Sequence, residues 1–472
     1  MSSTDPEQHS LYAKREPIFP RKVKGAFRTL KWWIMAVTLG LYYITPWLRW
    51  DRGPNLPDQA VLVDVANRRF FFLMIEIWPN EFYFVAGLLI MAGLGLFLFT
   101  SAAGRVWCGY ACPQTVWTDL FILVERWIEG DRNARLRLHR SRWTAEKIRK
   151  TLTKWTAWLL IGLATGGAWV FYFTDAPTLL RNLFAGDAAP VAYITIAILT
   201  ATTFFFGGFF REQICMYACP WPRIQAAMID EDTLTINYRY WRGEPRGKAS
   251  VQGSGDCIDC MACVNVCPMG IDIRDGQQMA CITCGLCIDA CNDVMDRIGK
   301  PRDLIGYMAL TDEVAEQAGK TPKSVWKHML RARTLMYTTL WSGVGIGLVV
   351  ALFIRSDIDV NVTPVRNPTY VTLSDGSIRN TYDMRILNKS GDDVEFHISL
   401  SSDKLLKISL EGTDWLMVPV AANKQQSQRV YVTAPAGSAA AIADRTELRF
   451  WIQDTSSKVR VYYDTIFNGR GN

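Results

Sequence analysis

Histidine is scarce in this chain of 472 residues, which contains only four: His9, His139, His328 and His397. None of the four lies inside a long apolar segment, so the sequence excludes a membrane haem held between two histidines. A phosphate-binding loop for nucleotides is also missing. The nearest candidate has Ala249 after Lys248, where the motif requires Ser or Thr.

Cysteine is absent from most of the chain. All 12 cysteines lie between Cys108 and Cys291, and none occurs in the long C-terminal part. A disulfide framework would not be confined in this way. The distribution predicts reduced thiols that act as ligands on one side of a membrane.

Eight of these cysteines form two runs with identical C-x2-C-x2-C-x3-C spacing, the bacterial pattern for iron–sulfur clusters. In this pattern three thiolates hold one cluster and the fourth reaches across to the other. We therefore expect two [4Fe–4S] clusters in a dicluster ferredoxin-like domain. The first is assigned to Cys257, Cys260, Cys263 and Cys291, and the second to Cys281, Cys284, Cys287 and Cys267.

The alternative for these eight residues is a pair of structural zinc sites, which also use C-x2-C pairs. Zinc sites rarely contain two four-cysteine runs of this form. The first run ends in Pro268, as the iron–sulfur pattern expects, whereas the second ends in Asn292.

Long apolar runs and many aromatic residues indicate a membrane protein. The hydrophobic fraction is 49%, and there are 18 tryptophans. Five runs are long enough to span a bilayer, at residues 30–48, 82–103, 155–173, 191–210 and 335–354. The aromatic run at 70–78 is too short to cross a core of ~30 Å, so we expect it at the membrane interface.

The net charge of +7 reflects basic residues beside these apolar runs, so it indicates topology and no nucleic-acid partner. The basic N-terminus and the loop at 131–154 are expected to be cytoplasmic. No small-residue processing site follows the first apolar run, so no cleavable signal is expected. The predicted domains are an N-terminus (1–29), a four-span membrane domain (30–230), a cytoplasmic ferredoxin domain (231–334), a fifth span (335–355) and an exported domain (356–472).

The membrane domain contains an internal repeat. Two apolar runs followed by a C-x-Y-A-C-P motif occur twice, first with Cys108, Cys112 and Pro113, and then, 107 residues later, with Cys215, Cys219 and Pro220. Both copies run in the same direction, so we expect both cysteine pairs at one membrane surface, facing each other.

The prolines in these motifs predict that new helices start at Pro113 and Pro220, with Cys112 and Cys219 as N-caps. A thiol at a helix N-terminus is expected to have a lowered pKa, and thiolates are soft ligands for Cu(I), zinc or iron–sulfur clusters. Cys108, Cys112, Cys215 and Cys219 are therefore a candidate copper site. The alternative is that these cysteines only pack at helix boundaries.

The C-terminal part, residues 356–472, changes character. Short runs with alternating polarity, such as IDVNVTP, YDMRILN and ELRFWIQD, are separated by turn residues. This pattern predicts an immunoglobulin-like β-sandwich without the cysteine pair of antibody domains.

Together, the dicluster motif, the paired C-x3-C-P motifs, the five spans and the C-terminal sandwich resemble the FixG/RdxA/CcoG family over nearly the whole chain. The resemblance implies a protein of the bacterial cytoplasmic (inner) membrane that assists assembly of cbb3-type cytochrome c oxidase. It also implies reduction of Cu(II) to Cu(I), with copper chaperones and oxidase assembly factors as partners. Related NapH and NosR ferredoxins work in quinol-linked electron transfer, but they generally lack this C-terminal domain.

Three functions remain open at this point. The chain could be a cupric reductase, a quinol-linked electron carrier, or an assembly scaffold whose clusters are structural. The sequence contains no recognisable quinone motif, and it does not identify the electron donor.

Overall fold

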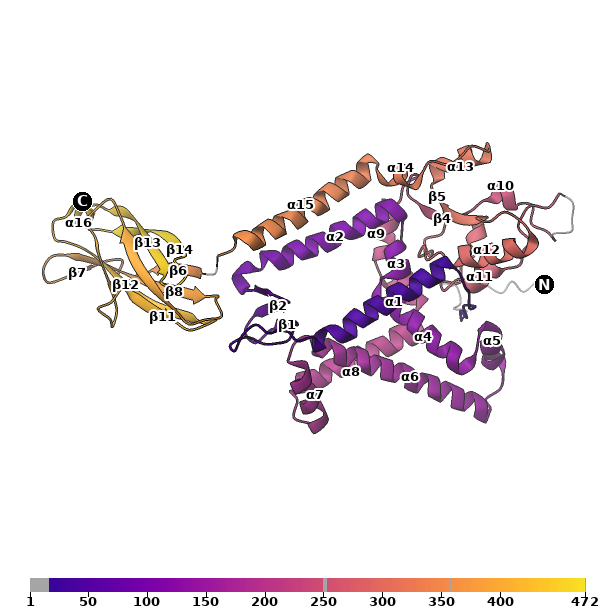
Figure 1. Cartoon of the computed structure of the whole chain (residues 1–472), viewed down its shortest axis with the longest axis horizontal. Coiled ribbons are helices and arrows are strands. Elements are labelled where there is room, and N and C mark those ends of the chain that lie inside the picture. The colour runs from indigo at the N-terminus through magenta and orange to yellow at the C-terminus, as the bar shows by residue number, and fades with distance from the viewer. Residues whose placement is uncertain (1–16, 249–252, 357, 472) are drawn as a thin grey trace, which may run out of the picture. The chain divides into compact units, whose positions relative to one another are not determined.

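The computed structural model describes residues 17–248, 253–356 and 358–471, so His9 and the first part of the predicted basic N-terminus lie outside the described residues. The chain forms two compact units. One contains the helices and the cysteine motifs, and the other contains the C-terminal strands (Figure 1).

The first unit is mainly helical up to the second C-x3-C-P motif. Its longer helices are α1 (Ala26–Ile44), α2 (Tyr83–Ala103), α4 (Pro113–Glu129), α5 (Arg132–Arg140), α6 (Ala145–Val170), α7 (Ala176–Ala185), α8 (Pro190–Phe205) and α9 (Trp221–Met228). A short helix, α3 (Val106–Tyr110), joins α2 to α4, and π-helical turns at Phe206–Phe210 and Ile214–Ala218 join α8 to α9. Long helices therefore precede the motif in both copies of the repeat. The motif itself differs, because it contains the α-helix α3 in the first copy and π-helical turns in the second.

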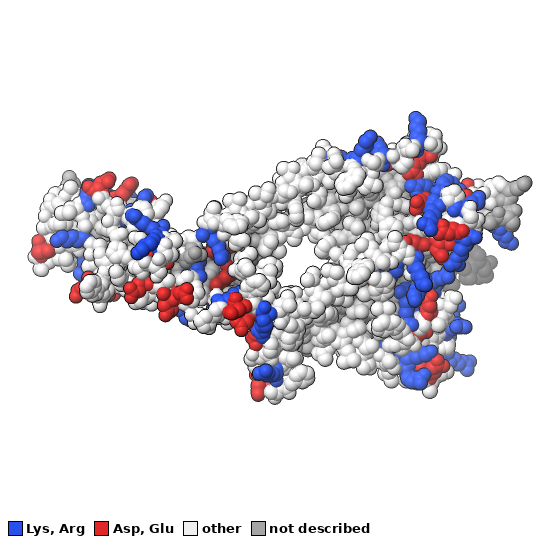
Figure 2. All heavy atoms as spheres, viewed as in Figure 1, with Lys and Arg blue, Asp and Glu red and all other residues white. Residues whose placement is uncertain are grey.

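Three helices of the structure are long and apolar enough to cross a membrane: Pro79–Ala103, Pro190–Phe210 and α15 (Ala332–Ile354). They coincide with three of the five predicted spans. The other two predicted spans fall on α1 and α6, which are helical but include charged residues such as Lys31 and Lys154. The number five therefore stays a prediction. Figure 2 shows that charged side chains are sparse over the long helices and gather around α5 and the ferredoxin elements.

The aromatic run at 70–78 folds as strands. β1 (Val61–Asp64), β2 (Arg69–Phe72) and β3 (Ile75–Ile77) form a three-stranded antiparallel sheet, in which Phe71 is buried. Alternation of side chains across this small sheet explains why the run is aromatic without being a span.

The ferredoxin part consists of β4 (Thr235–Tyr238) paired with β5 (Ile305–Met308), and of helices α10 (Tyr240–Gly243), α11 (Ala262–Val266), α12 (Leu286–Ile298), α13 (Leu310–Gln317) and α14 (Val325–Met329). It packs directly on α1 of the same unit. The Asp289 carboxylate on α12 accepts the backbone N–H groups of Phe27 (3.3 Å) and Arg28 (2.7 Å), in the first turn of α1. A residue distant in sequence thus satisfies donors that a helix N-terminus leaves unpaired.

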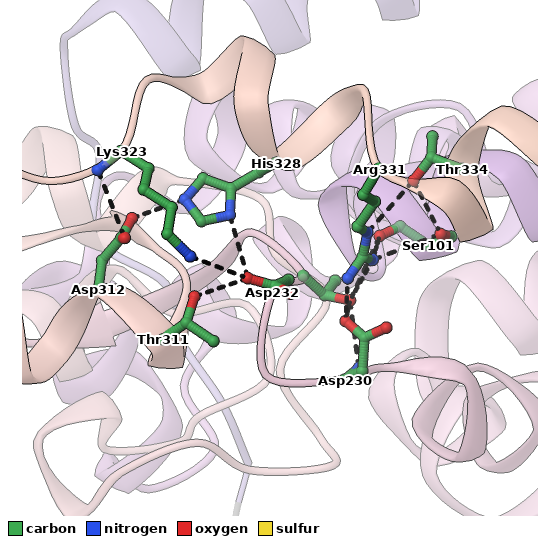
Figure 3. A network of polar contacts seen from close by, with 10 residues as sticks. Ser101, Asp230, Asp232, Thr311, Asp312, Lys323, His328, Arg331 and Thr334 are labelled. Atoms are coloured by element: carbon green, nitrogen blue, oxygen red, sulfur yellow. Dashed lines mark hydrogen bonds and ion pairs between the residues drawn. The ribbon is translucent and has the colours of Figure 1, made fainter.

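A polar network holds the start of α15 to the end of α2 (Figure 3). Arg331 donates hydrogen bonds to the Asp230 carboxylate and to the Ser101 carbonyl, and Arg333 donates to Asp230 at 2.9 Å. Beside it, the buried His328 ring lies 2.6 Å from the Asp312 carboxylate. Together these contacts connect α2, α13, α14 and α15 with the segment that follows α9.

Replacing Asp230 with asparagine should lower the free energy of unfolding by about 1–2 kcal/mol, because two charge-assisted hydrogen bonds are lost from a partly exposed carboxylate. A thermal unfolding series on the purified protein would measure this. Asp293→Asn, which removes an exposed pair with Arg297 on α12, is the matched control and should change stability by less than about 0.5 kcal/mol. Equal losses in both variants would contradict the role given to the network.

The second unit is a sandwich of two antiparallel sheets. One sheet has the order β10-β12-β8-β6, with β7 paired to β8, and the other has the order β11-β9-β13-β14. The strands are β6 (Ile358–Pro364), β7 (Val371–Thr372), β8 (Ile378–Asn388), β9 (Val394–Ser401), β10 (Lys407–Leu410), β11 (Met417–Val420), β12 (Gln425–Ala434), β13 (Arg445–Asp454) and β14 (Arg460–Asn468), with the short helix α16 (Ala439–Ile442) before β13. Inward side chains such as Tyr382, Ile398 and Phe450 are fully buried, so the core forms without a disulfide, as the sequence predicts.

Candidate functional site

A small cavity separates the first run of cysteines from α12. Its walls include Cys257, Cys260, Cys263 and Cys291, together with apolar residues such as Ile305. Cys291 belongs to the second run in sequence, but α12 places it beside the first. Cys260 is exposed, whereas the other three cysteines are buried.

A second small cavity shares Cys263 with the first and is also lined by Cys267, Cys281, Cys284 and Cys287. Cys267 follows α11 directly, which brings it to the second run. The two cavities therefore divide the cysteines into the two sets of the crossed pattern, with Cys263 between them. Four thiols in an apolar enclosure are a donor set that suits an iron–sulfur cluster in each cavity.

The two C-x3-C-P pairs lie near each other, as the repeat predicts. Burial, together with the nearby Cys112, Cys108 and Cys219, raises the pKa of the Cys215 thiol to about 12. The Cys108 thiol lies 3.1 Å from Gln225 Oε1, and Gln225 in turn donates to Thr100 on α2. Gln225 on α9 therefore ties the second copy of the repeat to the first.

Within residues 17–248, 253–356 and 358–471, no three side chains of His, Cys, Asp or Glu are close enough to share a single metal ion. This includes the quartet Cys108, Cys112, Cys215 and Cys219.

Cys112 is the N-cap of α4, as predicted from Pro113, but the predicted lowering of its thiol pKa is wrong. Burial raises the pKa of Cys112, and the backbone N–H groups of Gln114 and Thr115 oppose this rise without outweighing it. In the second copy the helix begins one residue later than predicted, at Trp221, so Pro220 is the N-cap and Cys219 precedes it.

The first motif packs against the loop of the second cavity. The Tyr110 hydroxyl donates to the Cys284 carbonyl at 3.0 Å, and the Arg105 guanidinium donates to the carbonyls of Met279 and Cys281. A Cβ added at Gly109 would lie 2.5 Å from the Ile282 carbonyl oxygen, so only glycine permits this approach. The backbone of α3 is thereby in contact with the cysteine loop.

The quartet and the second cavity also share one apolar cluster. Cys108 and Cys284 are buried in it with Ile282 and Leu286, and Cys215 packs against it. Cys257, Cys263 and Cys291 belong to a different cluster around Ile236 and Met295. Cys108 and Cys215 of the quartet therefore share their cluster with Cys267, Cys284 and Cys287 of the second set.

Sequence reasoning missed Arg105, Gln225 and Tyr110 as site residues. Arg105 looked like one more basic residue at the end of an apolar run, and nothing distinguishes Gln225 on α9. Tyr110 carried a signal, because the repeat places Tyr217 at the same position of the second motif.

Comparison with protein-family models assigns three parts of the chain. Residues 210–310 match a 4Fe-4S dicluster domain, residues 84–131 match a 4Fe-4S binding domain, and residues 348–470 match the IG-like fold at the C-terminus of FixG. Each of the three models covers less than half of the chain, but the first and second together include all 12 cysteines.

Curated relatives align along nearly the full length. Protein RdxB of Cereibacter sphaeroides is 72% identical over 100% of this chain and 100% of its own length. Protein RdxA of the same organism is 68% identical, covering 94% of this chain and 95% of its own length. The nitrogen fixation protein FixG of Rhizobium meliloti is 51% identical, covering 97% and 94%.

Proposed function

Because this chain belongs to the FixG/RdxA family of iron–sulfur proteins, we propose that it is a membrane-bound reductase that converts Cu(II) to Cu(I). In this proposal two [4Fe–4S] clusters are resident cofactors and copper is the substrate. The Cu(I) product would serve assembly of a cbb3-type cytochrome c oxidase through copper chaperones.

The two cavities supply the ligands of the resident clusters. Cys257, Cys260, Cys263 and Cys291 would hold the first cluster, and Cys267, Cys281, Cys284 and Cys287 the second. When bound, such clusters store and supply single electrons at low potential. A single electron is what the conversion of Cu(II) to Cu(I) requires.

A pair of thiols from the quartet Cys108, Cys112, Cys215 and Cys219 would bind the copper, because no three of them are close enough to share one ion. Thiolates prefer Cu(I) to harder cations, so they favour the reduced product. Because burial raises the thiol pKa of Cys108, Cys112 and Cys215, copper must displace protons as it binds.

One observation carries the proposal: α3 lies against the Cys281–Cys284 loop through Arg105, Gly109 and Tyr110. An electron acceptor held at the quartet would therefore be linked to the second cavity through direct contacts between α3 and this loop. A scaffold with structural clusters does not require this contact.

An assay of the anaerobically purified protein tests the function. The protein is reduced, freed of excess reductant and mixed with Cu(II) in the presence of a Cu(I)-specific chelator. We expect about two Cu(I) per chain, one for each stored electron, together with loss of the reduced-cluster spectrum. If the reduced spectrum persists, the cupric reductase is wrong. Rapid reduction by a quinol with no response to Cu(II) would favour the electron carrier instead.

The proposed topology has five spans in the inner membrane, with the N-terminus and both cavities in the cytoplasm and the C-terminal sandwich exported. This assignment follows from the basic loops. An alkaline phosphatase fused after the last residue should be active and a cytoplasmic reporter fused there should be silent. The opposite pattern would show that the number of spans is even.

A further inference from the structure

We infer that Arg105 is a positioning residue whose charge acts on both redox centres at once, the copper quartet and the cluster bound by Cys267, Cys281, Cys284 and Cys287. The inference rests on the proposed function for the copper half only. It assigns a role to a side chain that holds neither metal.

Arg105 is buried, with 3% of its surface exposed, directly after α2. Gly104 adopts a positive φ of 63° and turns the chain so that the guanidinium points into the ferredoxin loop. There it donates to the carbonyls of Met279 and Cys281, the latter at 3.1 Å. Its Nε has no hydrogen-bond partner, although it is buried.

Arg105 lies between the two sets of thiols. It is the N-cap of α3, the short helix that carries Cys108 of the quartet. Its guanidinium also donates to the backbone carbonyl of Cys281, a residue of the second cavity, at 3.1 Å. One cation is therefore placed beside both sets.

This cation is not neutralised by an acid. Among the residues that the structure describes, Arg105 forms no ion pair with a carboxylate and donates to neutral carbonyl groups. Arg274 at the first cavity is the contrast, because it is also buried but pairs with Asp272 and Asp259 at 2.6 Å each. An unpaired buried charge has a longer electrostatic reach than a paired one.

A fixed positive charge stabilises the more negative redox state of a neighbouring centre. Arg105 should therefore raise the reduction potential of the adjacent cluster and favour Cu(I) over Cu(II) at the quartet. Both effects favour the reduced state, of the second cluster in one case and of the bound copper in the other.

The test is a redox titration of the full-length anaerobic protein, with the cluster signals followed by electron paramagnetic resonance. Arg105→Gln should lower the potential of one cluster by about 59 mV, which is a tenfold change in a one-electron equilibrium constant. Arg105→Lys, which keeps the charge, should restore most of the shift. Arg274→Gln is the matched control and should move only the other cluster. A chelator competition should also show weaker preference for Cu(I) in Arg105→Gln.

If Arg105 had only a structural role, its substitution would change the iron content and the stability but not the reduction potential of a cluster that stays bound. If Arg105→Gln leaves both potentials unchanged, or shifts both equally, the inference is overturned even where the wild type reduces copper. If the wild type reduces no copper but the selective shift is found, the cluster half stands and the proposed function fails. If Arg105→Gln loses iron, Arg105→Lys decides, because a full tenfold shift with the charge retained would contradict an electrostatic role.

Discussion

Replacing Cys112 and Cys219 together with serine is expected to abolish copper binding and copper reduction, while about eight irons per chain remain bound. The two substitutions remove one thiol from each copy of the repeat, so neither C-x3-C-P motif keeps two thiol ligands. Loss of an outer contact to a metal ligand already costs 10- to 100-fold in affinity, and we expect loss of two direct ligands to exceed about 100-fold.

Separate measurement of copper and iron makes this result decisive. Copper binding is followed by Cu(I) chelator competition, and iron by elemental analysis and cluster absorption. Met216→Leu lies inside the second motif and preserves its apolar packing, so it is the matched control and should leave both metals unchanged. A loss of about four irons in the serine variant would make these cysteines cluster ligands. Unchanged copper reduction would make the thiols structural.

Single substitutions in the two cavities should each remove one cluster but differ in their effect on copper. Cys260→Ala changes an exposed residue of the first cavity, and Cys284→Ala changes a buried residue of the second. We expect iron to fall from about eight to about four in both variants. Because α3 contacts the Cys284 loop, only Cys260→Ala should still transfer a stored electron to copper.

Stopped-flow mixing of the reduced variants with Cu(II) measures that difference. Cys260→Ala should yield about one Cu(I) per chain, and Cys284→Ala essentially none. The reverse outcome would place the quartet next to the first cluster, against the packing seen here. Loss of all iron in either variant would show that the two clusters bind only together. Each set of cysteines would then be tested in a protein reconstituted with one cluster.

Much of the C-terminal sandwich could be predicted from its sequence. Runs such as YDMRILN and ELRFWIQD fall on β8 and β13, because strict alternation of apolar and polar residues has one structural solution in a sandwich. The short strands β7, β10 and β11 were missed. Segments of two to four residues such as Val371–Thr372 are too short to show a period, and they are strands only because a neighbour pairs with them.

The cysteine sets could also be predicted, because ligand spacing is local information. Which set meets the C-x3-C-P motifs was not predictable, since it depends on contacts such as Tyr110 with Cys284, 174 residues apart. The thiol pKa of Cys112 went wrong for a related reason. The helix N-terminus is visible in the sequence, but the burial that outweighs it comes from distant segments.

The cap that Asp289 provides to α1 has a consequence for biogenesis. α1 is synthesised well before α12, because the carboxylate that closes the first turn of α1 follows 262 residues after Phe27. Asp289 also lies midway between Cys287 and Cys291, two residues from a ligand of each cavity. A Cβ at Gly25 would overlap its carboxyl carbon at 2.2 Å, so the junction closes tightly. The two helices must therefore reach their final positions in the reverse of their order in the sequence. α12 has to be synthesised and packed before α1 can complete its first turn. An obstruction at the N-terminus should then trap the chain at the stage when its metallocentres are still open to the insertion machinery.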